Sequence, residues 1–161
     1  MRVGLVSEIE RKFRVSHLPD LGPDVAPGAA LRQGYVAIDG EVEVRVRSED
    51  GDCTLTVKGG SGLVRTEVDV PIDTARFDEL WVLAGERTIE KTRHRIPLGD
   101  LVAELDVYGG RLAGLAVVEV EFASVDRADG FEPPPWFGAE LTGTPGWSNA
   151  ALARDGAPGE T

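Results

Sequence analysis

The chain has 161 residues, which is enough for one domain with a sizeable hydrophobic core and too few for two ordinary domains. With 42% hydrophobic and 28% charged residues, its composition is that of a globular protein and excludes a disordered one. The formal net charge of −11 argues against general binding to nucleic acid or to anionic membranes, although a local basic pocket remains compatible with it.

Cysteine content and hydropathy narrow the class further. Cys53 is the only cysteine, so neither a disulfide framework nor a cysteine-based zinc site is expected. No apolar run approaches membrane-spanning length, and the N-terminus has a strand pattern in place of a signal peptide. We therefore expect a cytoplasmic protein, monomeric or homodimeric, that does not bind nucleic acid or membranes.

The first predicted strand covers residues 5–15. Because successive side chains of a strand point to opposite faces, Glu8, Glu10 and Lys12 share one side of it. Two carboxylates and an ammonium on one narrow face are costly to desolvate unless each finds an opposite charge or a metal. A loop rich in proline and glycine follows at residues 17–30.

Two Asp-Gly pairs then predict tight turns between three strands. Asp39-Gly40 and Asp50-Gly51 are hairpin signals, and they separate predicted strands over residues 31–37, 41–47 and 53–58. The glycine-rich stretch around Gly60 lacks the spacing of a phosphate-binding P-loop and predicts another hairpin loop.

The remainder of the chain holds one clear helix and four more strands. Phe77, Leu80, Trp81 and Ala84 fall at helical spacing between Pro71 and Gly85, with Asp73 or Thr74 able to cap the start and Gly85 the end. The other predicted elements are strands over residues 64–70, 88–96, 101–108 and 116–122 and a short helix near residues 148–154. Residues 1–155 are expected to form one domain, and residues 156–161 a disordered tail.

Charges are segregated by strand on the polar faces. An ordinary solvated sheet face carries mixed polar residues, whereas most of the strands here carry either basic or acidic side chains on their polar face. The basic positions are Lys12, Arg45, Arg47, Lys58, Lys91, Arg93 and Arg95. The acidic positions are Glu8, Glu10, Glu67, Asp69, Glu104, Asp106, Glu119 and Glu121.

Eight strands are also the number at which a barrel closes around a lumen that side chains or one small ligand can fill. We therefore expect a mostly β, α+β fold: a closed eight-stranded antiparallel barrel, or tunnel, with a charged lumen and a few helices packed outside. Such a lumen suits a ligand that is polyanionic on one side and metal-bridged on the other, for example a short polyphosphate with divalent cations. The alternative is a sheet whose charged face is simply solvated.

The order of these motifs resembles the CYTH superfamily, the triphosphate tunnel metalloenzymes. The similarity begins at Glu8-x-Glu10-x-Lys12 and spans nearly the whole chain. It continues through Gln33-Gly34-Tyr35, Val44-Arg45-Val46-Arg47, Thr56-Val57-Lys58-Gly59, Arg65-x-Glu67-x-Asp69, Glu90-Lys91-Thr92-Arg93, Glu104-Leu105-Asp106, Val118-Glu119-Val120-Glu121 and Trp136-x-Gly138-x-Glu140-Leu141-Thr142.

The resemblance implies a tunnel that hydrolyses or cyclises triphosphates with Mg²⁺ or Mn²⁺. Carried over by position, the phosphate-binding residues would be Lys12, Arg45, Arg47, Lys58, Lys91, Arg93 and, less directly, Arg95. One metal would be held by Asp106, Glu119 and Glu121, and a second, which orients the attacking water, by Glu8 and Glu10. Glu8, Glu10 and Lys12 would act in catalysis, and Glu67, Asp69 and Glu104 would support the basic residues.

Hydrolysis of inorganic triphosphate is the leading functional hypothesis. The same tunnel is compatible with a class IV adenylyl cyclase or a thiamine triphosphatase. A non-catalytic polyphosphate-binding module would keep the basic residues, but it has no need for the full set of carboxylates that this chain retains. Phosphoryl transfer relies mainly on positioning and charge neutralisation, which arginines and divalent metals supply.

Overall fold

The computed structural model describes residues 8–59 and 66–159, and within them the chain forms eight strands. These are β1 (Ile9–Arg14), β2 (Ala29–Asp39), β3 (Val42–Glu49), β4 (Asp52–Gly59), β5 (Thr66–Ile72), β6 (Thr88–Leu98), β7 (Leu101–Tyr108) and β8 (Ala116–Phe122). All eight coincide with predicted strands, so the alternation in the sequence located them correctly. The predicted strand starts at residues 5 and 64, and most of the predicted glycine-rich loop, lie outside the described residues.

Helix α1 (Thr74–Ala84) has the ends that the sequence predicts. The Asp73 carboxylate accepts a hydrogen bond from the Arg76 N–H at 2.8 Å, and Gly85 ends the helix with a φ of 61°. Phe77 packs on the outer side of the sheet against Val46 and Cys53. Gly34 of β2 allows the close approach, because a Cβ there would lie 2.9 Å from the Cβ of Ala84. The predicted tail helix is α3 (Asn149–Asp155).

Two short helical segments were not predicted. A single 3₁₀ turn, η1 (Gly110–Leu112), connects β7 to β8, and the one-and-a-half-turn helix α2 (Val125–Asp129) follows β8. Both are too short to produce a helical repeat of apolar residues, so the pattern that identified α1 could not reveal them. In the described part of the chain, no helix is long and apolar enough to cross a membrane.

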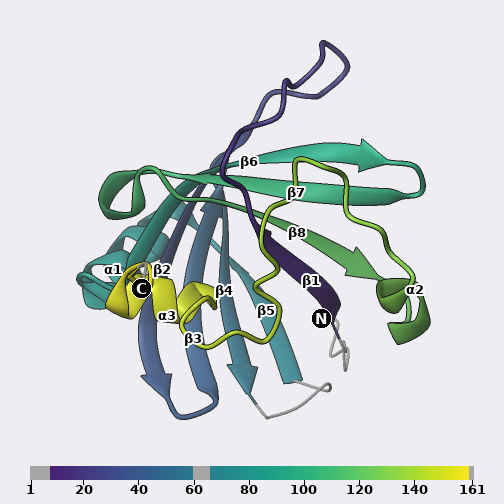
Figure 1. The fold of residues 1–161 in the computed structure, drawn as a ribbon. Helices are drawn as coiled ribbons and strands as arrows, with labels where there is room; N and C mark the ends of the chain where they lie inside the picture. The colour runs from purple at the N-terminus through teal and green to yellow at the C-terminus, as the bar shows by residue number, and fades with distance from the viewer. Residues whose placement is uncertain (1–7, 60–65, 160–161) are drawn as a thin grey trace.

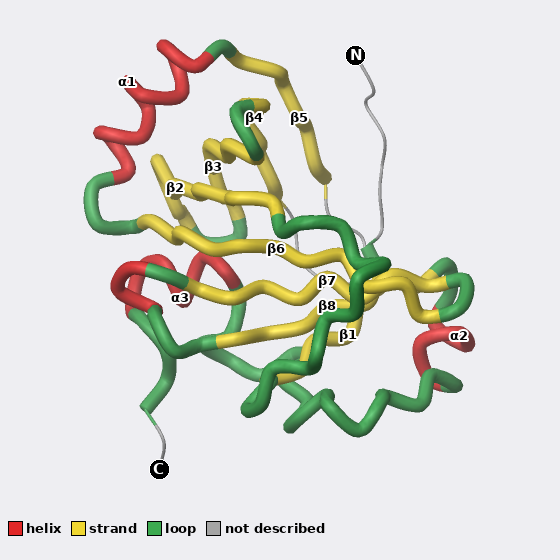
Figure 2. Tube along the Cα trace, turned by 90° about the horizontal axis from the view of Figure 1, so that it is seen from above, coloured by secondary structure: helices red, strands yellow, loops and turns green. Residues whose placement is uncertain are grey.

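All eight strands belong to one antiparallel sheet with the order β1-β8-β7-β6-β2-β3-β4-β5. Figure 1 shows β2 to β5 running steeply relative to β6, β7, β8 and β1, so the sheet is strongly curved. In Figure 2, α1 lies outside the half of the sheet that contains β2 to β5, and α2 lies at the far end of β8 and β1. The charged faces of the strands line the concave side of the curved sheet.

Strand pairing does not close the sheet into a barrel among the described residues, so the predicted closure is not confirmed. The sheet ends at β1 and β5. The free edge of β1 is instead paired with the segment after residue 137: the N–H of Gly138 donates to the Arg14 carbonyl and the N–H of Leu141 donates to the Lys12 carbonyl, both at 2.8 Å. Because these backbone groups are already paired, the Lys12–Arg14 part of β1 cannot form a ladder with β5.

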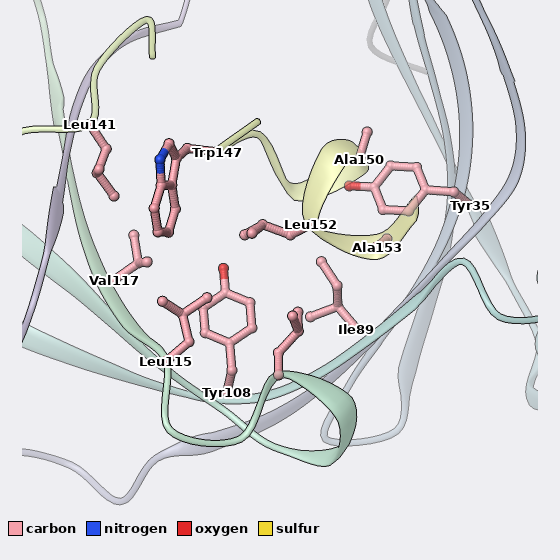
Figure 3. Close-up of a cluster of buried hydrophobic side chains, with 11 residues drawn as sticks. Tyr35, Ile89, Tyr108, Leu115, Val117, Leu141, Trp147, Ala150, Leu152 and Ala153 are labelled. Atoms are coloured by element: carbon pink, nitrogen blue, oxygen red, sulfur yellow. The ribbon is translucent and has the colours of Figure 1, made fainter. Parts of the chain in front are cut away.

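One end of the concave side is filled by apolar side chains. Leu152 and Ala153 of α3 are completely buried and pack near Ile89, Tyr35 and the Tyr108 ring. Figure 3 shows α3 inserted among these side chains, with Trp147 and Leu141 beside them. The concave side is therefore divided into an apolar end, which α3 occupies, and a charged remainder.

Candidate active site

The charged remainder of the concave side encloses a cavity of about 180 Å³, called the central cavity below. Side chains from seven strands reach it, and all of its lining residues except Asn149 are candidates identified from the sequence. The lining residues are Glu8, Glu10, Arg45, Arg47, Lys58, Glu67, Arg93, Glu104, Glu119, Glu121 and Asn149. Residues separated by more than 100 positions in the chain thus converge because the sheet curves.

Beneath the cavity lies a buried ion cluster made of Lys91, Arg93 and Asp106. The Asp106 carboxylate is completely buried and accepts from Lys91 Nζ at 2.7 Å, from Arg93 Nε at 2.7 Å and from Arg93 Nη2 at 2.8 Å. Burial opposes ionisation of Asp106, but the two cations outweigh it and hold its pKa below the ordinary value. Both oxygens of this expected metal ligand are therefore engaged by cations.

The same neighbours affect the two cations of the cluster differently. Burial lowers the pKa of Lys91, and the attraction of Asp106 offsets this only in part. For Arg93, burial acts in the same direction, but hydrogen bonds and charge from Asp106, followed by Glu104, raise its pKa overall. Glu104 accepts from Arg93 Nη1 at 2.8 Å, so the guanidinium is held by two carboxylates.

Two other cations, Lys12 beside the central cavity and Lys58 in its lining, also face carboxylates. Lys12 Nζ lies 3.1 Å from Glu119 Oε1 and donates to the Trp147 carbonyl at 3.1 Å. Lys58 Nζ lies 3.3 Å from Glu67 Oε2 and 3.6 Å from Glu8 Oε2. The contact with Glu8 links β4 to the residue before β1, across the gap between the two edges of the sheet.

Arg95 and Asp69 lie outside the lining of the central cavity. Arg95 is half exposed, with Nη2 at 2.7 Å from Glu49 Oε1 and Nε at 3.5 Å from Glu104 Oε2. Asp69 accepts a hydrogen bond from the Thr56 hydroxyl at 2.6 Å, and that hydroxyl is 3.5 Å from Arg45 Nη2. Asp69 thus acts on Arg45 through a neutral intermediate.

Arg45 and Arg47 differ from the remaining cations of the cavity because their neighbours across the strands are uncharged. In the strand register, Arg45 stands between Tyr35 and Thr56, and Arg47 stands between Gln33 and Thr54. Within residues 8–59 and 66–159, no carboxylate oxygen is within 4.0 Å of either guanidinium. Both Nε atoms are buried and have no hydrogen-bond partner. The positive charge of these two residues is therefore available to an anion.

The neutral residues beside Arg45 and Arg47 were not identified as site residues from the sequence. Gln33 and Tyr35 lie on the predicted strand that includes Gly34, but only the pairing of β2 with β3 places them beside the two arginines. Asn149 comes from α3 and accepts a hydrogen bond from the Tyr108 hydroxyl at 3.0 Å. A search for uncharged polar residues at inward positions of the strands would have found Gln33 and Tyr35, whereas no local pattern indicates Asn149.

Carboxylates crowd the other side of the cavity. Glu10 keeps access to solvent, yet its partly enclosed position, followed by the charge of Glu119, raises its pKa to about 7. Partial burial and the charges of Glu8, Glu104 and Glu67 raise the pKa of Glu121. For Glu119, burial is outweighed by Lys12 and Lys91, so its pKa is lowered. This side of the cavity would be stabilised by a bound cation.

The donor set fits a divalent metal that is only partly coordinated by protein. In the described part of the chain, no three Asp, Glu, His or Cys side chains are grouped closely enough to form a complete metal cage. Mg²⁺ does not require one, because it keeps several waters and commonly binds through one or two carboxylates plus substrate phosphates. Glu119 Oε1 is buried and has no aligned hydrogen-bond donor, so it is suited to such a role.

Comparisons with known proteins identify the family. The CYTH domain family model matches residues 7–133. An inorganic triphosphatase from Nitrosomonas europaea is 43% identical over 151 residues, covering 92% of this chain and 97% of that protein. An inorganic triphosphatase from Acetivibrio thermocellus is 36% identical over 150 residues, covering 92% of this chain and 94% of that protein.

The similarity to a solved structure also extends over nearly the whole chain. The crystal structure of an inorganic triphosphatase is 41% identical, aligns with a TM-score of 0.74, and covers 96% of this chain and 98% of that one. The family model and the sequence relatives thus agree with the family that the motifs indicate. The chain belongs to the CYTH domain family.

Proposed function

We propose that this protein hydrolyses inorganic triphosphate to pyrophosphate and phosphate in the central cavity, with the help of Mg²⁺ or Mn²⁺. The observation that carries the proposal is the pair Arg45 and Arg47, two inward guanidiniums whose cross-strand neighbours are all uncharged. Partly buried cations without a carboxylate partner are costly, so a protein that keeps them has a use for their charge. The relatives named inorganic triphosphatases support the choice of substrate.

The chain's own residues account for binding and orientation of the anion. Arg45 and Arg47 offer planar forks that match phosphate oxygens, whereas Lys58 and Lys12 act as point charges beside them. Asp106 holds Lys91 and Arg93 in fixed positions, so these cations need no reorganisation when negative charge develops on the phosphoryl oxygens. We therefore interpret Asp106 as the anchor of the buried ion cluster.

Glu8, Glu10, Glu119 and Glu121 are the carboxylates that we propose for the metal. When bound, a divalent ion polarises the phosphoryl oxygen and favours deprotonation of a bound water. Glu10 and Glu119 lie on the paired strands β1 and β8, and the charge of Glu119 helps to raise the pKa of Glu10, so a cation bound between them would relieve this repulsion. The Lys58–Glu8 contact and the bound anion would complete the wall of the tunnel, in place of a ladder between β1 and β5.

The alternatives differ in the substrate or in catalysis. A class IV adenylyl cyclase needs room for adenosine, and a thiamine triphosphatase needs room for an organic group. The apolar end of the concave side is filled by α3, which leaves little room there for an organic group, and the relatives named inorganic triphosphatases favour the smaller inorganic substrate. A polyphosphate-binding module would bind triphosphate without consuming it.

Two variants on opposite sides of the cavity test the proposal. Phosphate release is measured with inorganic triphosphate, ATP and thiamine triphosphate, each with Mg²⁺ or Mn²⁺, and binding is measured by calorimetry. Glu119→Gln should lower turnover by roughly a thousandfold, because losing a metal ligand costs several kcal/mol of barrier. Binding of triphosphate in excess chelator should persist or strengthen as repulsion falls.

Arg45→Ala should weaken binding and lower the maximal rate, since a phosphate fork is lost. Undiminished turnover by Glu119→Gln, or full activity of the parent in excess chelator, would contradict the metal-assisted mechanism. Tight binding of every triphosphate with no release of phosphate or pyrophosphate would favour the binding module.

A further inference from the structure

Gln33 is an unusual interior residue because its side-chain amide makes no hydrogen bond. It is 0% exposed, and neither its amide nitrogen nor its amide oxygen has a hydrogen-bond partner. A buried unpaired amide costs free energy, and native structures contain few such groups. The side chain stands across β2–β3 from Arg47 and across β2–β6 from Ile89.

Gln33 differs from the residues that stand opposite several other cations of the site, because it is uncharged. Arg93 stands opposite Asp106, Arg95 opposite Glu104 and Lys12 opposite Glu119, so a carboxylate faces each of these cations. At the position of Gln33 the chain carries instead the uncharged counterpart of Glu. An amide can accept a hydrogen bond from a guanidinium and leave its full charge in place, whereas a carboxylate would neutralise it.

We propose that Gln33 is a positioning residue that supports Arg47 through its neutral amide and so keeps the charge of Arg47 available to the phosphate chain. The Gln33 amide and the Arg47 Nε–H are both unpartnered, so they are not hydrogen-bonded to each other in the ligand-free structure. Directly opposed residues of antiparallel strands have Cβ atoms about 4.5–5.5 Å apart, so a side-chain rotation is enough to bring the amide oxygen to that N–H. This inference rests on the proposed function, because it assumes that Arg47 binds a phosphate oxygen.

Gln33→Glu tests the inference by adding one charge without changing the shape of the side chain. The dissociation constant for inorganic triphosphate, measured calorimetrically in excess chelator, should rise at least tenfold because Arg47 acquires a competing internal anion. The melting temperature of the ligand-free protein should stay the same or rise, since the buried guanidinium gains a partner. In the metal-activated assay, KM should rise by a larger factor than kcat falls.

A charge control and a neutral variant complete the experiment. Val57→Glu adds the same charge on the exposed outer face of β4 and should leave the dissociation constant and KM unchanged. Gln33→Met removes the amide, keeps the length and adds no charge. It should weaken binding about two- to tenfold, the range expected for one neutral hydrogen bond, without lowering the melting temperature.

If Gln33 serves Arg47, both substitutions therefore lower the affinity for triphosphate without lowering the stability of the ligand-free protein. If Gln33→Glu loses both, or if it binds triphosphate like the parent, the inference is overturned and Gln33 is a packing residue. Should Gln33→Glu fail to fold, the Gln33→Met result decides, and parent-like binding by that variant refutes the inference. Failure of the parent itself to bind triphosphate would refute the proposed function, which is a separate outcome.

Discussion

Asp106→Asn is the substitution that we expect to lower the stability of the folded protein most. The Asp106 carboxylate is completely buried and is the shared acceptor of Lys91 and Arg93, whose side chains are 0% and 8% exposed. An asparagine keeps the shape but removes the charge and turns one acceptor oxygen into an NH₂ donor directed at two cations. The protein would then have to bury an ammonium that has lost its ion-pair partner.

The magnitude follows from the geometry. Removing one partner of a buried ion pair costs about 3–5 kcal/mol, because the remaining charge stays desolvated. For a chain of this length, each kcal/mol lowers the melting temperature by roughly 2–4 °C, so a decrease of roughly 6–20 °C is expected. Arg93 retains Glu104 at 2.8 Å, which places more of the cost on Lys91.

The pH dependence provides an internal check. Burial already lowers the folded-state pKa of Lys91, and losing Asp106 would lower it further. Between this lowered folded-state pKa and the unfolded-state pKa of about 10.4, the unfolded chain then binds more protons than the folded one. The stability contributed by Lys91 therefore increases as the pH rises through that window, and the deficit of Asp106→Asn relative to the parent should shrink toward pH 10.

The assay is reversible denaturation of the metal-free protein between pH 7 and pH 10. Asp100→Asn is the matched control, because it removes the same charge from an exposed pair with Arg127 and should leave the melting temperature unchanged. An unfolding free energy of Asp106→Asn within about 1 kcal/mol of the parent would refute the anchor role. Normal stability combined with an altered metal requirement would instead support Asp106 as a metal ligand.

Three further predictions concern the carboxylates, the metal and the tail. The pKa of Glu10 is raised to about 7, so between pH 4.5, the ordinary value, and pH 7 the folded protein binds more protons than the unfolded chain. The melting temperature of the metal-free protein should therefore fall as the pH rises across that window. Glu10→Gln should flatten this fall. Ca²⁺ added with Mg²⁺ should inhibit phosphate release, since its larger and looser coordination misplaces the water, and equal rates in Ca²⁺ alone would contradict this. Gly138→Ala should detach the segment paired with β1, because the new Cβ would collide with the Arg14 carbonyl. Faster hydrogen exchange of the backbone amides at positions 138 and 141 would show this detachment. Unchanged protection of these amides would disprove it.

The sequence by itself determined the strands and their charged faces. Strict alternation, as in residues 41–47, leaves little choice of secondary structure, because the opposite set of side chains can be buried only if the segment is extended. Segregation of the charges by strand then favoured a common interior over a solvated face, and every charged residue that lines the central cavity was identifiable in this way. The resemblance to the CYTH superfamily, which the family match confirms, came from the same positions.

Only the tertiary structure decided how those charges are partnered. The pattern of Asp106 and Arg93 in the sequence does not reveal that they stand opposite each other on β6 and β7, and that pairing changes the interpretation of Asp106 from a metal ligand to an anchor. The anchor role of Asp106 is the proposal that this pairing supports. The sequence pattern also does not reveal that Arg45 and Arg47 face uncharged neighbours. Strand register across the sheet, and the pairing of β1 with residues 138–142 instead of β5, depend on contacts between residues distant in the chain, which local alternation does not encode.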